Sequence, residues 1–310
     1  MRAAGDPVTA YLQNPEKATP EQIALIKHKY HLDEPNYIQY YYWLNGVVHG
    51  DWGISQITKD PVLETIGNKF PATFELSIVA MFLAVSVGIG VGTRAAVKVN
   101  SPFDQGSRVM SLVGVSIPVF WLGVLLLALF YYYLGGPFEP GRIDKMYDTA
   151  PTPTNFFLID SVLDLNWNMF VDVVQHLLLP SITLAFSSTA IIIRIMRSSM
   201  LEVLGSEYIR TARSKGLPER EVIRRHARRN ALIPTTTVVG LSFGGLLGGA
   251  VLTETIFLWP GLGRWAAEAA LNIDTAGIMG FTMLTAIIYV LANLIVDLVY
   301  AQLDPRVRLG

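Results

Sequence analysis

The sequence contains no cysteine and little charge. Only 16% of its 310 residues are charged, whereas soluble domains carry about a quarter. Hydrophobic residues make up 51% and the mean hydropathy is +0.39, which argues against a single soluble globule. Because cysteine is absent, disulfide scaffolds, thiol catalysis and cysteine-ligated metal sites are excluded.

Catalytic motifs are also missing. The chain has no GxxxxGK[ST] phosphate-binding loop, so we expect no ATP hydrolysis by the chain itself. Its five histidines form no HExxH pair or closely spaced ligand set, and we predict no metal site, no bound cofactor and no catalytic residue. The formal net charge of -1 argues against a strongly basic nucleic-acid binder.

Long charge-free windows are present instead. A helix needs about 20 mostly apolar residues to cross a bilayer, and five windows approach or exceed that length. We therefore predict an all-α polytopic membrane protein. The windows run from Leu76 to Thr93, Val109 to Phe138, Val173 to Ile193, Asn230 to Thr253 and Thr275 to Val296.

The basic residues predict the orientation, because short cytoplasmic loops are enriched in lysine and arginine. The loop between the third and fourth windows is strongly basic, the loop between the first and second is basic, and the intervening loops are richer in acid. We therefore predict that the C-terminus lies in the cytoplasm. The cytoplasmic basic residues include Arg94, Lys98, Arg108, Arg194, Arg197, Arg220, Arg224, Arg225, Arg228, Arg229, Arg306 and Arg308.

Counting back across five spans places residues 1–70 outside the cell. They are polar and lack a secretory signal at their start, and nothing in the sequence would carry them across a bilayer. We therefore expect a sixth, leading membrane helix before this segment. The predicted division is an external cap (1–70), a transmembrane domain (71–303) that includes a cytoplasmic loop (202–229), and a cytoplasmic tail (304–310).

The external cap shows two helix signals. Thr19 precedes Pro20 and stands three residues before Gln22, which is the pattern of a capping box. We predict helices from Pro20 to about Tyr30 and from Tyr37 to about Val48. The aromatic residues of the second helix fit either a membrane-interface belt or a vestibule that meets a partner or solute.

The cytoplasmic loop predicts two short helices joined by a sharp turn. The first runs from about Glu202 to Lys215 and ends at Gly216, which suits a left-handed C-cap; the second restarts at Pro218. Eight basic residues lie between Arg210 and Arg229. Three interpretations compete: an anchor at anionic headgroups, a nucleic-acid surface, and a docking element for a partner protein. The absence of interleaved aromatic residues disfavours nucleic acid, and the small residues at the turn favour docking.

The run from Glu207 to Leu217, continued by Asn230–Pro234, resembles the EAA loop of bacterial and archaeal ABC importer permeases. The chain most closely resembles the B-type subunit of the dipeptide, oligopeptide and nickel permeases, and the matches cover nearly its whole length. Departures are small: Arg213 and Ser214 occupy positions that are often alanine, and Glu207 stands where aspartate is common. The other matching segments are Gly5–Pro7, Gly50–Ser55, Pro71–Leu76, Ser116–Trp121, Arg197–Glu202, Glu254–Phe257, Trp259–Gly263 and Asp297 with Asp304–Arg306.

The resemblance implies a multi-pass protein of a prokaryotic inner membrane with a type I ABC importer fold. It also implies a coupling helix that sits in a groove of a cytoplasmic ATPase. It implies four partners: a second permease, two ATPase subunits that bind ATP and Mg, and an extracytoplasmic solute-binding protein. Family members carry a first membrane helix just before the Gly5–Pro7 match. Ala212 is expected to keep the helix face flat beneath the ATPase, and Gly216 to allow close approach. The residues assigned to coupling are Tyr208, Arg210, Thr211, Ala212, Arg213, Lys215, Gly216 and Leu217.

Small and polar residues mark the spans. Gly240, Gly244 and Gly248 recur every four residues and predict close helix packing or space for a solute path. Asn293 and Asp297 share a helical face and add a polar seam. Glu75, Glu254 and Asp297 lie near span ends, where we expect capping or pairing. Gly88, Gly90 and Gly92 are predicted to loosen the inner end of their helix rather than to form one face.

The favoured function is the membrane subunit of an ATP-driven importer of di- or oligopeptides that works by alternating access. The same family machinery also imports oligosaccharides, nickel or glutathione, and these solutes remain alternatives. An ion-driven carrier or channel would call for ionisable residues in mid-span or for an internal repeat, and the sequence shows neither.

Overall fold

The computed structural model describes residues 19–29, 33–147, 150 and 152–303. These residues form helices and connecting turns, with one isolated bridge between Ile54 and Pro61. The predicted all-α fold is confirmed. The α-helices are α1 (Pro20–Lys29), α2 (Asn36–Val48), α3 (Val62–Val97), α4 (Pro102–Ser116), α5 (Val119–Leu127), α6 (Phe157–Leu163), α7 (Trp167–Leu204), α8 (Glu207–Ser214), α9 (Glu219–Glu221), α10 (Arg228–Gly249), α11 (Val251–Ile256), α12 (Leu262–Leu271) and α13 (Thr275–Leu303).

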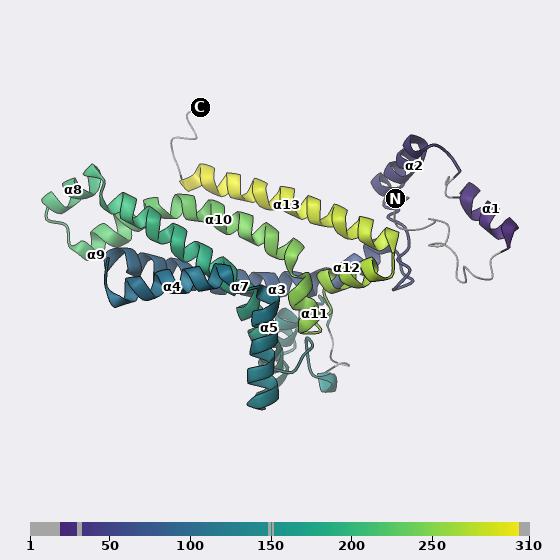
Figure 1. The fold of residues 1–310 in the computed structure, drawn as a ribbon, viewed down its shortest axis with the longest axis horizontal. Helices are drawn as coiled ribbons and strands as arrows, with labels where there is room; N and C mark the ends of the chain where they lie inside the picture. Colours follow the sequence, from purple (N-terminus) through teal and green to yellow (C-terminus); the bar gives the residue numbers. More distant parts are fainter. Residues whose placement is uncertain (1–18, 30–32, 148–149, 151, 304–310) are drawn as a thin grey trace.

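The long helices lie roughly along one axis, with α8 and α9 at one end and α1, α2 and α12 at the other (Figure 1). In the described residues, α3, α7 and the Thr275–Ile295 part of α13 are long and apolar enough to cross a membrane. The pair α4 and α5 makes a fourth if it is one bent span. The fourth predicted window forms α10, which packs against both α7 and α13, and runs on into α11.

The second predicted window does not form one straight span. The chain bends by 100° between α4 and the segment Val119–Tyr133, which comprises α5 and the π-helical η4 (Ala128–Tyr133). Ile117 is extended, with φ -77° and ψ 125°, because a residue before proline is driven out of the helical region. Pro118 therefore ends α4, and α5 stands across the other long helices (Figure 1).

The core lies mainly between α3 and α7, which make the most extensive helix pair. A Cβ at Gly88 would come within 2.5 Å of Ile192 Cγ2, and one at Gly92 within 2.8 Å of the Ile193 carbonyl, whereas Gly90 faces open space. As predicted, the three glycines do not form one face, because Gly90 lies apart from the other two. The predicted loosening of this helix end is not what the structure shows. Gly88 and Gly92 are four residues apart, so they lie on one face and let α3 approach α7 closely.

The capping box at α1 is confirmed. The backbone N–H of Gln22 donates to Thr19 Oγ1 at 3.3 Å, and the backbone N–H of Thr19 donates to Gln22 Oε1 at 3.2 Å. Both predicted helices of the cap are present within one residue of their expected bounds. The segment from residue 1 to 18, including the Gly5–Pro7 match, lies outside the described residues.

Candidate functional site

The candidate coupling segment is α8 and the turn that follows it. The predicted helix from Glu202 to Lys215 is divided: α7 ends at Leu204, and α8 begins after an extended Ser206. The second helix was predicted to be short, but it is the start of a long helical segment, because α9 continues through the π-helical η6 (Val222–Ala227) into α10. Helix α8 is therefore a separate short helix between the end of α7 and the helical segment that begins with α9.

One side of α8 is anchored in the chain's own core. Ile209 and Ala212 are buried against Met196 and Met200 of α7 and against Val222 of η6. Ala212 is only 7% exposed. The expected role of Ala212 in a flat, partner-facing surface was therefore wrong: its small side chain allows α8 to pack closely on this chain's helices.

The turn at Gly216 has the predicted left-handed conformation. Its φ is +76°, the N–H of Gly216 donates to the Arg213 carbonyl at 2.9 Å, and that of Leu217 donates to the Ala212 carbonyl at 3.4 Å. These two bonds define a Schellman motif. Only glycine adopts this backbone without steric cost, so the residue fixes where α8 ends and α9 begins.

Arg213 and Glu219 form an ion pair across this turn. Arg213 Nε lies 3.0 Å from Glu219 Oε2, and Nη2 lies 2.7 Å from Oε1. The Arg213 hydrogen bonds hold the pKa of Glu219 below its ordinary value. Arg213, which the sequence analysis assigned to coupling with the ATPase, thus has an ion-pair partner within the chain.

Tyr208 connects α8 to α10. Asn230 Nδ2 donates to the Tyr208 hydroxyl at 2.6 Å, in addition to a bond with the His226 carbonyl in η6 at 3.3 Å. The sequence analysis placed Asn230 in a matching segment but gave it no role. The bond joins α8 to the first turn of α10.

The exposed side of α8 is polar. Arg210 bonds Glu207 Oε1 at 2.8 Å, Thr211 donates to the Glu207 carbonyl, and Lys215 is exposed. Leu217 is half-buried and packs on the Ile209 cluster. Of the predicted coupling residues, Tyr208, Arg210, Thr211, Arg213, Lys215 and Gly216 are exposed, and Ala212 and Leu217 are partly or fully covered.

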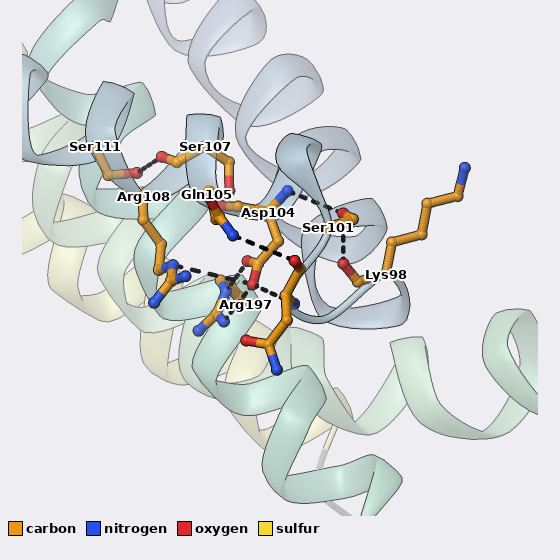
Figure 2. Close-up of polar contacts among 9 residues, drawn as sticks. Lys98, Ser101, Asp104, Gln105, Ser107, Arg108, Ser111 and Arg197 are labelled. Carbon is orange, nitrogen blue, oxygen red and sulfur yellow. Dashed lines mark hydrogen bonds and ion pairs between the residues drawn. The ribbon is translucent and has the colours of Figure 1, made fainter.

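A second pair, which the sequence analysis missed, lies near the same end. Asp104 of α4 is 0% exposed and accepts from Arg197 of α7, with Nε–Oδ1 at 2.5 Å and Nη2–Oδ2 at 2.9 Å. The N–H of Asn100 also donates to Asp104 Oδ2, while Ser101 caps α4. Figure 2 shows Arg197 and the more distant Arg108 both pointing at Asp104. The turn between α3 and α4 is thereby fixed to α7.

The glycine stripe of α10 faces α13 in part. A Cβ at Gly244 would meet the Tyr289 ring at 3.2 Å and Ala292 at 3.5 Å. This agrees with the prediction that the glycine allows close helix packing within the chain. Gly240 is half-buried on α10 and Asn293 is half-buried on α13. The side-chain surroundings of Gly248 and Asp297 lie outside the described residues.

Two of the predicted span-end carboxylates have partners at the other end of the molecule. Glu75 bonds Arg142 Nη2 at 2.8 Å and the N–H of Leu158 at 2.7 Å. Glu254 accepts from Thr73 Oγ1 at 2.6 Å and from the N–H of Arg264 at 2.9 Å. Because Glu75 is 5% and Glu254 is 0% exposed, the expected pairing is part of the core that joins α3 to the loops.

Sequence comparisons place this architecture in a family. The model described as "Binding-protein-dependent transport system inner membrane component" matches residues 88–309, and its N-terminal companion matches residues 4–77. The probable D,D-dipeptide permease DdpB of Escherichia coli K12 is 43% identical over 99% of this chain and 89% of its own length. The dipeptide permease DppB of the same strain is 44% identical over 98% and 90%. The oligopeptide permease AppB of Bacillus subtilis is 38% identical over 99% and 92%.

The fold has a counterpart among solved structures. A chain of the inward-facing MetNI methionine ABC transporter superposes with a TM-score of 0.56 at 15% identity, covering 75% of this chain and 93% of that one. At this identity the likeness concerns the fold alone, and it agrees with the predicted type I importer architecture. Together with the family matches over most of the sequence, it shows that the chain belongs to the binding-protein-dependent transport system inner membrane components, the permeases of ABC importers.

Proposed function

We propose that this chain is a membrane subunit of an ATP-driven importer that moves dipeptides into a prokaryotic cell by alternating access. The observation that carries the proposal is the 43–44% identity, over 98–99% of the chain, to two dipeptide permeases. Such similarity across both the membrane helices and the residues before them supports a shared solute class as well as a shared fold.

The importer would contain this chain, a second related permease, two ATPase subunits and an extracytoplasmic solute-binding protein, all assembled in or on the lipid bilayer. ATP and Mg would bind to the ATPase subunits, and nucleic acid has no part. The basic end with α8 and α9 would lie in the cytoplasm, as would the C-terminus, because positive residues favour that side. Residues 1–70 and α12 would lie outside.

The exposed side of α8 would contact the ATPase. Tyr208, Arg210, Lys215 and the Gly216 turn form this side, and their basic charge suits an acidic groove, where it would set register and association rate more than affinity. Because Arg213 is already paired with Glu219, it would hold the shape of the turn.

Motion of α8 would reach the membrane helices through three contacts. The Ile209 cluster transmits force to α7, the Tyr208–Asn230 bond transmits it to α10, and the Arg197–Asp104 pair extends it from α7 to α4. Since packed cores are bistable rather than continuously deformable, closure of the ATPase dimer would move these helices as a unit.

Reconstitution of the purified importer in liposomes tests the proposal. We expect ATP-dependent accumulation of labelled dialanine, and loss of accumulation when Gly216→Arg places a large charged side chain in the turn. A wild-type complex that accumulates an oligosaccharide, glutathione or nickel but no peptide would overturn the solute. A Gly216→Arg complex with unchanged uptake would overturn the coupling role of α8. Uptake of tri- and tetrapeptides should be measured in the same assay, because the relative from Bacillus subtilis is an oligopeptide permease.

A further inference from the structure

A cavity of about 500 Å³ lies between α5, α7, α10 and α11. It lies at the bend between α4 and α5, since Val119, the first residue of α5, is part of its wall. Of the described residues that line it, four carry hydroxyl side chains and the others are apolar or glycine. The hydroxyls belong to Ser187, Ser188, Ser242 and Thr253.

Several other hydroxyls on the same helices bond their own backbone, although Ser181 of α7 also lacks a partner among the described residues. Thr183 and Thr189 of α7 donate to the carbonyls of Leu179 and Ala185, each at 2.8 Å, which is the ordinary way a hydroxyl is satisfied inside an apolar helix. Thr235 and Thr236 of α10 do the same. None of the four cavity hydroxyls forms a hydrogen bond with the part of the chain that the structure describes.

Two of the four are well buried. Ser188 is 7% and Thr253 is 1% exposed, yet their oxygens are not enclosed by protein as that of Ser181 is. Because these oxygens open onto the space and are not used by the described part of the chain, they are free to bond a polar group that enters it. The space itself supplies the missing partner when a polar ligand occupies it.

We propose that this cavity is a solute site of the permease, in which the hydroxyls of Ser188, Ser242 and Thr253, with Ser187 beside them, bind the amide groups of a passing dipeptide. The inference rests on the proposed function. The volume falls in the range of small-ligand pockets, about 300–1,000 Å³, which are likewise mostly apolar with a few polar groups. Hydroxyls both donate and accept, as the N–H and C=O of a peptide bond require.

The wall also accounts for two properties that a transport site needs. None of the described residues that line the cavity is charged, so the site engages the neutral backbone and holds no terminal charge tightly, which allows release. Its apolar part comes from leucine, isoleucine and valine, which tolerate different solute side chains. Gly245 forms part of the lining and faces open space, leaving room for the solute.

Cysteine accessibility tests the site directly, because this chain contains no cysteine. In a complex whose other subunits have also been made cysteine-free, Ser188→Cys, Ser242→Cys and Thr253→Cys are treated with a small water-soluble thiol reagent, with and without the binding protein loaded with dialanine. We expect labelling at all three positions and slowing by about fivefold or more with dialanine, the factor that about 1 kcal/mol of contact gives. Thr189→Cys, whose native hydroxyl bonds its own helix, is the control and should show no dialanine effect.

A matched pair of substitutions separates the hydroxyl from packing. Thr253→Val keeps the shape and removes the hydroxyl, whereas Thr253→Ser keeps the hydroxyl. We expect Thr253→Val to raise the KM of dialanine uptake about fivefold, Thr253→Ser to stay near wild type, and Thr189→Val to do the same. If wild type imports dialanine while the cysteines are unprotected and Thr253→Val is normal, the cavity is filled by lipid or by the second permease and the proposal fails. If wild type imports no dialanine, the proposed function fails instead.

Discussion

Arg197 of α7 donates two hydrogen bonds to the buried carboxylate of Asp104, from Nε at 2.5 Å and from Nη2 at 2.9 Å. Its position is seven residues before the last residue of α7, and α8 follows directly. The pair therefore joins the start of α4 to the part of α7 that carries the candidate coupling helix (Figure 2).

Removal of the Asp104 charge should weaken the whole basic end. Asp104→Asn leaves the Arg197 guanidinium, 18% exposed, without its counter-ion. Loss of one partner of a buried pair costs roughly 3–5 kcal/mol. We expect the apparent unfolding temperature of the solubilised complex to fall and uptake to drop with it, as measured by thermal denaturation and liposome transport.

Arg108 provides the control for that change. Its side chain is half exposed and its Nε lies 3.9 Å from Asp104 Oδ2, so Arg108→Ala should cost less than about 1 kcal/mol. Equal destabilisation by Asp104→Asn and Arg108→Ala would show that the Arg197 contact contributes no more to stability than the Arg108 contact does.

The Arg213–Glu219 pair should affect coupling more than stability. Both side chains are about half exposed, so Glu219→Gln should change the free energy of unfolding by less than about 1 kcal/mol. Because the pair sets the shape of the Gly216 turn, we expect a several-fold loss of dialanine-stimulated ATPase activity, measured as phosphate release in the reconstituted importer.

Charge exchange distinguishes this shape-setting role from contact with the ATPase. The double variant Arg213→Glu with Glu219→Arg restores the ion pair but reverses the charge that each position presents. Recovery of stimulation would support the role of the pair within the chain. A double variant as defective as the single ones would assign Arg213 to the ATPase contact that the sequence first suggested.

Gly216→Ala should strain the turn. At φ +76° an alanine pays about 1–2 kcal/mol, although a Cβ there meets nothing within 4 Å. We expect weaker binding of the ATPase subunits, measured by co-purification, with little loss of helicity. Gly67→Ala in α3 also enters open space but at a helical backbone, so it should leave co-purification unchanged.

Local signals in the sequence predicted local structure well. The Thr19 capping box and the left-handed Gly216 depend on residues close together in the chain, and both are found. Of the five apolar windows, the first, third and fifth lie in helices long and apolar enough to cross a membrane. The bend at Pro118 was missed although its signal is local, because a count of charge-free residues takes no account of proline.

Contacts between distant residues were not predictable in this way. Asp104 and Arg197 are 93 positions apart, and Tyr208 and Asn230 are 22 apart, so no helical period links them. The inward direction of Ala212 likewise depends on where α7 and η6 lie. Which face of α8 is exposed was therefore settled only by tertiary packing.

The glycines of α3 offer a test within one helix. A Cβ at Gly88 or Gly92 would lie 2.5–2.8 Å from atoms of α7, so Gly88→Ala and Gly92→Ala must push the two helices apart, at a cost of about 1–3 kcal/mol each. Gly90 lies between them and meets nothing within 4 Å. Gly90→Ala should be neutral or stabilise by up to about 1 kcal/mol, since alanine favours the helix. Thermal denaturation of the three solubilised variants measures the difference. Three equal shifts would mean that α3 and α7 are not closely packed at these glycines.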